Sequence, residues 1–523
     1  MLIAHLDFKG VLPGPSHLPQ LLQDIADQGF DAVLVEYEDV FPFENYDISA
    51  APRERWSKRT LHTFLETAAR LKLEVIPLQQ CLGHLEYVFR WKKFREFTLD
   101  EDYPSMIDFA DKSAQQFLFG MLEQVMDAHP DARFVHVGMD EAHGLIGYAR
   151  DRKLDVVELF LNHLEEICKK CEARGKTPII WSDMLEDNFN PATLKRFETF
   201  KNRVILCTWD YATIGEKTKT ARIAGSRVCR AWLGEPANPQ APPIFPTTKW
   251  IEDLSPAARK AITPFQDGRE FQSPFWCDVW VQRGFRVLGA SASRASEDFA
   301  VLPHYNTRIT NVVTWEETAR RCHAMGTVVT SWARGTTWCP PIFPFDLTWP
   351  ILENAARAAG KNPLPFFGGI DKKVTARIFS ALGRCREDWR IELQVAEEME
   401  ALAPQLKSHQ FEWQCAALMA RVLHWQRRAA AVQDEVDYFA ANTRPVPAEW
   451  QRRIDEQIAT RRAGKDLRQK TKAHFGARYA GEAFEEWLRD VFDAPIARLE
   501  QCGVVCATKK KQAHALWKAK LEI

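Results

Sequence analysis

Phe134-Val-His-Val-Gly-Met-Asp-Glu141 is a short apolar run that ends in two adjacent carboxylates. Its length and composition are typical of a β-strand covered on both faces. Because side chains alternate along a strand, His136, Gly138 and Asp140 are expected on one face. Asp140 would then point inward at the end of the strand, with Glu141 as the first residue beyond it. Gly138 would leave space below the carboxylates in which a substrate fits.

Seven further apolar runs share this character, and amphipathic stretches separate most of them. The eight predicted strands are Ile3–Phe8, Ala32–Tyr37, Glu74–Gln79, Phe134–Val137, Pro178–Trp181, Val204–Trp209, Arg286–Ser291 and Thr327–Trp332. The predicted helices include Leu18–Gln28, Lys58–Lys72, Ala114–His129 and Val157–Arg174. This alternation predicts an α/β fold, a parallel (β/α)8 TIM barrel. A doubly wound open sheet is the alternative, although no Gly-x-Gly-x-x-Gly follows any strand.

The length of 523 residues predicts more than one domain. We expect the catalytic barrel to span residues 1–360, with a proline-rich insertion near residues 234–280. The insertion follows a strand, so it should border the mouth of the barrel. Residues 361–523 show helical spacing of apolar residues and predict an α-helical C-terminal domain.

Composition excludes several classes of protein. The 69 Lys and Arg residues against 70 Asp and Glu residues give a net charge of −1, so neither nucleic acid nor an anionic membrane is an expected partner. No apolar run is long enough to span a bilayer. The first ten residues do not resemble a secretory signal, and 12 scattered cysteines favour a reducing cytoplasm over a disulfide framework. The oligomeric state is not determined by the sequence.

Acidic and aromatic residues gather at the ends of the predicted strands. They are His5, Asp7 and Lys9; Glu36, Glu38 and Asp39; His84 and Glu86; Trp181 and Asp183; Trp209 and Tyr211; and Trp332 and Arg334. Parallel strands of a barrel end at one face, so these side chains should surround one mouth. Indoles offer flat apolar faces to a sugar ring, and carboxylates bind its hydroxyls. The pattern therefore predicts a carbohydrate substrate.

His136-Val-Gly-Met-Asp-Glu141 resembles the H-x-G-x-D-E signature of glycoside hydrolase family 20, the β-N-acetylhexosaminidases. The wider pattern is similar to the hexosaminidase D-like branch of that family. It comprises His5-Leu-Asp-Phe-Lys-Gly10, Glu36-Tyr-Glu-Asp-Val-Phe-Pro42, Val75-Ile-Pro77 leading to Gly83-His84-Leu-Glu86, Trp181-Ser-Asp-Met184 and Trp209-Asp-Tyr211. The resemblance covers roughly residues 1–355 and leaves out the helical part.

The resemblance implies an exo-β-N-acetylhexosaminidase that works by retaining, substrate-assisted catalysis without cofactor or metal. The substrate's own acetamido oxygen attacks the anomeric carbon. Asp140 would orient the acetamide and stabilise the oxazolinium charge. Glu141 would protonate the leaving oxygen and later deprotonate water, which requires it to be protonated and buried beside ionised Asp140.

The resemblance also implies a substrate-binding set around the two carboxylates. His84 matches a family histidine near the acid, and Glu38 or Asp39 would hold its imidazole in orientation. The remaining members are His136, Asp7 and the three indoles that wall the sugar, namely Trp181, Trp209 and Trp332.

Three positions depart from the family pattern. Asp7 and Lys9 stand where many members have an arginine that grips sugar hydroxyls, and Arg334 replaces the usual glutamate of strand eight. The choice between the gluco and galacto configurations therefore stays open. Strand seven lacks the tyrosine that polarises the acetamide, so Tyr211 is the predicted substitute, with Tyr305 as the fallback.

Two other functions remain open. A metal-dependent hydrolase on the same barrel would need ligands to converge from His5, Asp7, His84, His136 and Asp140. A catalytically inactive carbohydrate-binding protein would tolerate the replacement of Glu141 by glutamine.

Overall fold

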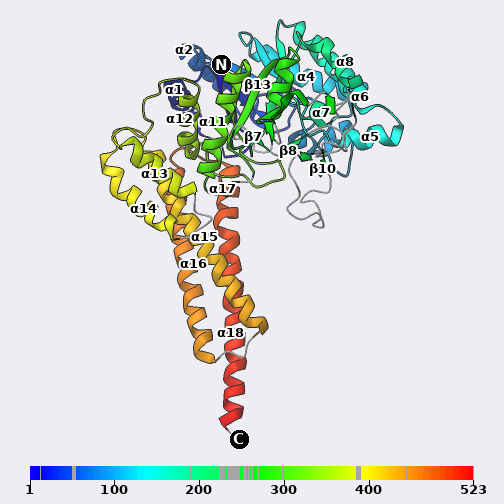
Figure 1. Ribbon diagram of the computed structural model, residues 1–523. Helices are drawn as coiled ribbons and strands as arrows, with labels where there is room; N and C mark the ends of the chain where they lie inside the picture. Colours follow the sequence, from blue (N-terminus) through cyan, green and yellow to red (C-terminus); the bar gives the residue numbers. More distant parts are fainter. Residues whose placement is uncertain are drawn as a thin grey trace.

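The computed structural model describes residues 1–521 except for fourteen short segments within that range, and it leaves out the last two residues (Figure 1). The residues outside the description are 12, 50–54, 188–190, 216, 219, 223–229, 233–247, 251–255, 257–258, 261–262, 268–269, 297, 384–389, 443–445 and 522–523.

Eight parallel strands close into a barrel. In order around it they are β1 (Leu2–Asp7), β14 (Gly326–Ser331), β13 (Arg286–Arg294), β6 (Ile205–Trp209), β5 (Thr177–Trp181), β4 (Phe134–His136), β3 (Glu74–Leu78) and β2 (Ala32–Glu36). Ile3 pairs with Val328 of β14 on one side and with Ala32 of β2 on the other, which closes the ring. The predicted barrel is confirmed, and every strand overlaps its predicted range, although β4 ends one residue earlier and β13 three residues later than predicted.

Helices surround the barrel. The longer ones are α1 (Leu18–Asp27), α2 (Lys58–Arg70), α4 (Lys112–Ala128), α5 (Gly144–Arg152), α6 (Val156–Glu172), α8 (Pro191–Phe197), α10 (Phe275–Gln282), α11 (Tyr305–Cys322) and α12 (Trp349–Ala358). The short ones are α3 (Glu86–Phe89) and α7 (Asp183–Asp187). No helix in the described part of the chain has an apolar stretch that would cross a membrane.

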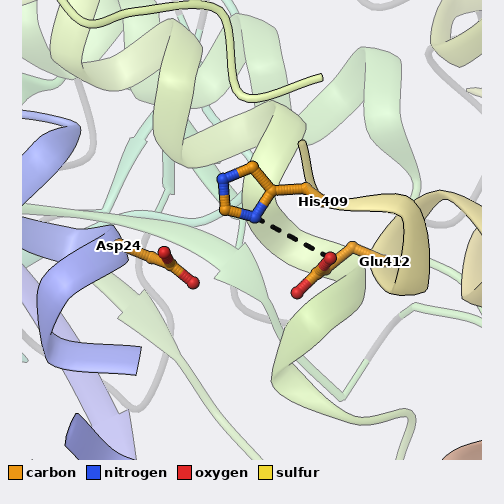
Figure 2. A group of neighbouring side chains, drawn as sticks. All are labelled: Asp24, His409 and Glu412. Carbon is orange, nitrogen blue, oxygen red and sulfur yellow. Dashed lines mark ion pairs between the residues drawn. The ribbon is translucent and has the colours of Figure 1, made fainter. Parts of the chain in front are cut away.

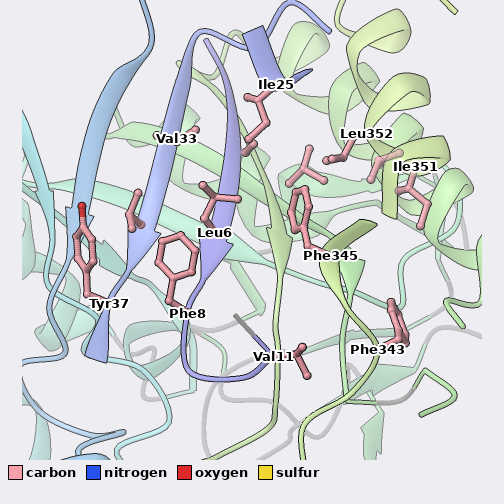
Figure 3. Packing of buried hydrophobic residues seen from close by; sticks show 14 of the residues in the cluster. Leu6, Phe8, Val11, Ile25, Val33, Tyr37, Phe343, Phe345, Ile351 and Leu352 are labelled. Atoms are coloured by element: carbon pink, nitrogen blue, oxygen red, sulfur yellow. The ribbon is translucent and has the colours of Figure 1, made fainter. Parts of the chain in front are cut away.

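The strands are apolar on both faces because each face is covered. One cluster fills the barrel interior and includes Ile3 and Leu34. A second cluster lies between the strands and the helices and includes Leu6 of β1, Ile25 of α1 and Leu352 of α12 (Figure 3). This double burial explains why the strands appear in the sequence as continuous apolar runs rather than alternating ones.

The connection between β6 and β13 spans residues 210–285. Its described parts contain two small sheets, formed by β7 (Lys217–Thr218), β11 (Gln266–Asp267) and β12 (Glu270–Gln272), and by β8 (Thr220–Arg222), β9 (Arg230–Trp232) and β10 (Thr248–Trp250). The predicted proline-rich segment, with Pro236, Pro239, Pro242, Pro243 and Pro246, lies outside the described residues.

The chain after α12 is helical, as predicted. It contains α13 (Lys372–Gly383), α14 (Ile391–Leu402), α15 (Gln410–Asn442), α16 (Pro447–Phe475), α17 (Glu482–Leu488) and α18 (Ala494–Leu521). Helices α15, α16 and α18 run side by side away from the barrel, with the C-terminus at the far end (Figure 1). The outer core of the barrel continues into α13, α14 and the first part of α15 through Phe379, Met399 and Trp413. The domain boundary at residue 360 therefore stays a prediction.

Candidate active site

A cavity of about 300 Å³ opens at the carboxyl ends of the barrel strands. Its walls come from the ends of β1, β3, β4, β5, β6, β13 and β14 or from the residues just beyond them. They are Lys9, Gln80, His84, Asp140, Glu141, Trp181, Trp209, Tyr211, Ala295, Ser296, Trp332, Arg334 and Gly335. This face is where barrel enzymes place their catalytic groups. Of the described residues in the long connection after β6, only Tyr211 lines the cavity.

The segment that carries the two carboxylates leaves the strand earlier than predicted. Strand β4 ends at His136, and Gly138, Met139 and Glu141 all have positive φ angles, of 67°, 80° and 45°. The backbone is no longer a strand here, but the predicted faces are kept, because Met139 packs into the outer core and Asp140 lies on the cavity wall, where it is 7% exposed.

The space expected below the carboxylates is filled. A Cβ atom on Gly138 would lie 1.7 Å from the side-chain oxygen Oε1 of Gln80. The glycine therefore makes room for the Gln80 side chain, and that side chain forms part of the cavity wall. The prediction that a substrate occupies this space is wrong.

His84 joins the two carboxylates. Its Nε2 atom lies 3.3 Å from Oδ2 of Asp140 and 3.5 Å from Oε2 of Glu141. Burial opposes a charge on this imidazole, but Asp140, Glu141 and the nearby Glu86 raise the pKa of His84 well above its ordinary value. An imidazolium therefore stands between the carboxylates at neutral pH.

Two expectations for the carboxylates' surroundings are wrong. The side chain of Glu141 is 45% exposed rather than buried. Glu38, expected to orient His84, instead lies 3.9 Å from Nζ of Lys9. Glu38 and Asp39 line a neighbouring cavity of about 260 Å³ and are absent from the wall around Asp140.

The backbone of Glu141 is fixed from the next strand. Its N–H donates to Oδ2 of Asp183 at 2.9 Å, while Nε1 of Trp209 donates to Oδ1 of the same carboxylate at 3.4 Å. Asp183 is 1% exposed and lies two residues after the end of β5. The buried carboxylate of Asp183 thus positions both Glu141 and the indole of Trp209.

Four aromatic rings form the side of the cavity. The centroids of Trp181 and Trp332 are 5.9 Å apart, Tyr211 stacks on Trp209 at 5.1 Å, and Tyr211 lies 6.5 Å from Trp332. Burial raises the pKa of Tyr211 well above its ordinary value, so its hydroxyl keeps its proton and can donate. The fallback Tyr305 is wrong for this role, because it is buried and donates to the carbonyl of Leu347.

His136 lies beneath the cavity rather than in its wall. Its ring centroid is 4.4 Å from that of Trp181, and its Nδ1 accepts the N–H of Gly138 at 3.1 Å. Burial lowers the pKa of His136 to about 3, so the ring is neutral. The expected contact with substrate is wrong, and the ring instead supports Trp181 and the turn that leads to Asp140.

Lys9 occupies the position at which an arginine was expected to bind sugar hydroxyls. Its Nζ lies 3.3 Å from Asp7, 3.4 Å from Glu36 and 4.6 Å from the ring centroid of Trp332. Burial alone would lower the pKa of Lys9, but the surrounding carboxylates raise it. Asp7 also accepts the N–H of Ala333 at 2.7 Å and does not line the cavity, so its expected contact with substrate is wrong.

Sequence reasoning missed Gln80 and gave no role to Asp183 or Arg334. Gln80 and Asp183 each lie two residues after the end of an apolar strand, which was the available signal. Arg334 was noted at its strand end and as a departure from a family pattern. In the structure its guanidinium lines the cavity and pairs with Glu486 of α17 at 3.0 Å, so the helical region contacts a residue of the wall.

The five predicted metal ligands do not form one coordination group. Nε2 of His5 lies 3.4 Å from Glu36, His84 joins Asp140, and His136 packs below Trp181. Within the described ranges, the group of His, Cys, Asp or Glu side chains whose ligand atoms lie within 4.8 Å of one another is a different one, at α1 and α15.

Comparison with known proteins gives a sequence relationship over part of the chain. No family model matches. Over 195 residues, 36% of this chain, the sequence is 31% identical to hexosaminidase D of Bos taurus and of Homo sapiens. The match covers 56% of the bovine protein and 40% of the human one, so the chain spans about half the length of the curated relatives it matches.

Solved structures resemble this chain at low identity. A β-N-acetylhexosaminidase from Bacteroides fragilis is 12% identical, with a TM-score of 0.44 over 73% of this chain and 70% of that one. The GH20 β-N-acetylhexosaminidase of Streptomyces coelicolor is 12% identical, with a TM-score of 0.44 over 74% and 68%. At these values the likeness carries no argument about chemistry, which has to come from the residues of the cavity.

Proposed function

We propose that this chain is an exo-acting β-N-acetylhexosaminidase that releases a terminal non-reducing N-acetylglucosamine or N-acetylgalactosamine from a glycoside. The partial similarity to hexosaminidase D supports the class of enzyme. The observation that carries the proposal is the meeting of Asp140 and Glu141 at His84, on the wall of a cavity lined by three tryptophans.

The reaction we propose uses the sugar's own acetamide as nucleophile. The acetamido carbonyl oxygen forms a bond to the anomeric carbon while the bond to the aglycone oxygen breaks, and Glu141 gives its proton to that leaving oxygen. Water then attacks the anomeric carbon of the oxazolinium ion and gives a proton back to Glu141, while the bond from that carbon to the acetamido oxygen breaks and restores the acetamide. Two inversions at one carbon retain the β configuration.

Asp140 has the surroundings that its proposed role requires. A carboxylate held beside the His84 imidazolium can accept the acetamide N–H and stabilise the positive charge that develops on the ring formed with it. The Tyr211 hydroxyl, which keeps its proton, is the proposed donor to the acetamide carbonyl. Both groups lie on the wall of the same cavity.

The exposure of Glu141 fits a group that serves both halves of the reaction. A half-exposed side chain at the rim reaches an aglycone that extends into solvent and then a water that replaces it. Its backbone bond to Asp183 fixes where the side chain begins, which limits the entropy lost on reaching the reacting oxygen.

A panel of aryl glycosides tests the proposal. The aryl β-N-acetylglucosaminide and β-N-acetylgalactosaminide should be hydrolysed, and the aryl β-glucoside without an acetamide should not, because it lacks the nucleophile. Glu141→Gln should lose most of the activity on the first two substrates. Equal turnover of the β-glucoside would reject the substrate-assisted scheme, and no turnover of any glycoside would reject the enzyme class.

We further propose a cytoplasmic setting. The ten described cysteines are all unpaired, and nine of them are buried, as suits a reducing compartment. Cell fractionation of the full-length protein tests this, and recovery from a secretory compartment would contradict it.

A further inference from the structure

Three side chains meet where helix α1 of the barrel contacts the start of α15. Asp24 belongs to α1, Glu412 lies in the first turn of α15, and His409 immediately precedes that helix. Figure 2 shows the three facing a common point, and one ligand atom of each lies within 4.8 Å of the other two. None of them lines the cavity around Asp140.

Within the described part of the chain, no hydrogen-bond donor reaches one carboxylate oxygen of this group. Oε1 of Glu412 accepts from Arg478, but Oε2 accepts no hydrogen bond although the residue is 1% exposed. Nδ1 of His409 lies 3.8 Å from Oε2, which is too far for a hydrogen bond. A buried carboxylate oxygen without a donor is costly, so this atom points to a ligand that the side chains do not supply.

The carboxylates around the group outnumber the Lys and Arg side chains that pair with them. Among the described residues, the buried carboxylates of Glu412 and Asp346 share the guanidinium of Arg478, and no Lys or Arg pairs with the buried carboxylate of Asp24. A cation between Asp24, His409 and Glu412 would supply the missing positive partner.

The three side chains are already held in place. Oδ1 of Asp24 accepts from Nε2 of Gln20 at 2.7 Å along α1. The imidazole of His409 stacks on Phe366, with ring centroids 3.6 Å apart. Ligands oriented by such outer contacts lose little freedom when a metal binds.

We propose that Asp24, His409 and Glu412 form a structural site for a divalent transition-metal ion, with zinc as the expected occupant, that ties α1 of the barrel to α15. One imidazole and two carboxylates suit zinc, with water completing a tetrahedron. Metal–ligand bonds of about 2.1 Å place tetrahedral donors roughly 3.4 Å apart, so a small closure of the group suffices. Magnesium and calcium prefer sites made of oxygen alone.

Zinc binding by the chelator-treated full-length protein tests the site. Isothermal titration should show one tight site, and a hundredfold excess of zinc over its Kd should raise the midpoint of thermal unfolding by several degrees. Asp24→Asn keeps an acceptor for Gln20 but removes the charge, so it should weaken zinc binding at least tenfold and abolish the thermal shift.

Asp27→Asn is the matched control. Asp27 lies on the same helix and accepts from Gln23 four residues earlier, as Asp24 does from Gln20, but it is exposed and outside the group. This variant should bind zinc as the wild type does. A second variant, His409→Asn, suits the positive φ of 56° at that position and should also lose the tight site.

The outcomes separate this site from the proposed hydrolase, because the readouts are metal binding and thermal stability. Equal zinc binding by the wild type, Asp24→Asn and His409→Asn would assign the metal to another place and overturn the proposal. An absence of tight binding in the wild type would overturn it as well.

Discussion

At the scale of single residues, Gly138 is required both for its backbone conformation and for its lack of a side chain. Its φ of 67° is a conformation that other residues adopt at a cost of about 1–2 kcal/mol. Its missing side chain also leaves the volume that Gln80 fills. The turn that brings Asp140 to the cavity therefore depends on glycine for its backbone and for its packing.

Gly138→Ala should destabilise the protein by about 2–4 kcal/mol, the sum of backbone strain and overpacking. Gly175→Ala is the control, since Gly175 has a φ of 65° but open space around the position of its Cβ. Denaturant unfolding should show a smaller loss of unfolding free energy for Gly175→Ala than for Gly138→Ala. Adding Gln80→Ala to Gly138→Ala should recover only the packing part, and equal losses in the two single variants would contradict this account.

Asp140→Asn tests the acidic group at the same scale. Under the proposed function, the loss of its charge should lower kcat by about 10²–10³-fold, as expected when one group that stabilises developing charge is removed. It should also lower the pKa of His84. Burial lowers that pKa, and among the groups that raise it the charge of Asp140 has the largest effect. Steady-state kinetics and an NMR titration of the imidazole measure the two effects. A wild-type rate, or an unchanged titration, would refute the assigned role.

At the scale of elements, helix α17 reaches the candidate site through one ion pair. Glu486 pairs with Arg334 at 3.0 Å, while the carbonyls of Thr337 and Cys339 accept from the same guanidinium. The helix is docked nearby through Trp487, which donates to the carbonyl of Ala300. A residue of the helical region therefore helps to hold a side chain of the cavity wall.

Glu486→Gln should raise KM by about 2–5-fold and leave kcat nearly unchanged. The reason is that a half-exposed ion pair contributes at most about 1 kcal/mol, and here it holds a wall residue rather than a reacting group. Glu485→Gln is the control, since Glu485 precedes it on α17 but pairs with Lys472. The aryl-glycoside assay measures both variants, and equal KM values for them would contradict the coupling.

The elements of the barrel were predictable from the sequence because strands buried on both faces need apolar residues throughout. That requirement made β2 and β6 visible as short runs of Val, Ile and Leu. The end of β4 was not predictable, because three positive φ angles after His136 depend on contacts with other segments. Those contacts come from Gln80 after β3 and from Asp183 after β5, which no local pattern connects with the turn.

In the candidate site, the predictable residues were those that barrel geometry alone places. Residues that end strands on the inner side, such as Trp181 and Trp209, lie on the cavity wall because barrel geometry alone places them there. Glu38 and Tyr305 were misplaced because their directions depend on Lys9 and on the carbonyl of Leu347, far away in the sequence. Contacts with residues far away in the sequence thus determine side-chain directions that local spacing does not predict.

At the scale of the whole molecule, the barrel and the helices behave as one packed body. Asp346 illustrates this, since its carboxylate pairs with Arg478 at 3.3 Å and accepts from the hydroxyl of Tyr479 at 2.8 Å. The carbonyl oxygen of Arg478 in turn accepts the N–H of Gly14, which follows β1, at 2.8 Å. Unfolding of either part should therefore expose the buried groups of both.

The pH dependence of unfolding should report on the histidine below the cavity. Burial lowers the pKa of His136 to about 3, against about 6.5 in the unfolded chain, so the folded state excludes a proton that the unfolded state binds. Its contribution to stability is complete above pH 6.5 and is lost as the pH falls toward 3. Between pH 6.5 and pH 5 the loss is about 2 kcal/mol, from about 1.4 kcal/mol per pH unit.

His136→Phe keeps a ring against Trp181 but removes the titrating group, so it isolates this effect. The difference in unfolding free energy, wild type minus variant, should become about 2 kcal/mol less favourable to the wild type between pH 6.5 and pH 5. Denaturant unfolding at the two pH values measures it. The comparison cancels the other titrating groups, because the two proteins share them. A difference that stays constant with pH would therefore mean that the imidazole is protonated in the folded protein as it is in the unfolded chain. That result would remove the neutral acceptor on which the N–H of Gly138 depends.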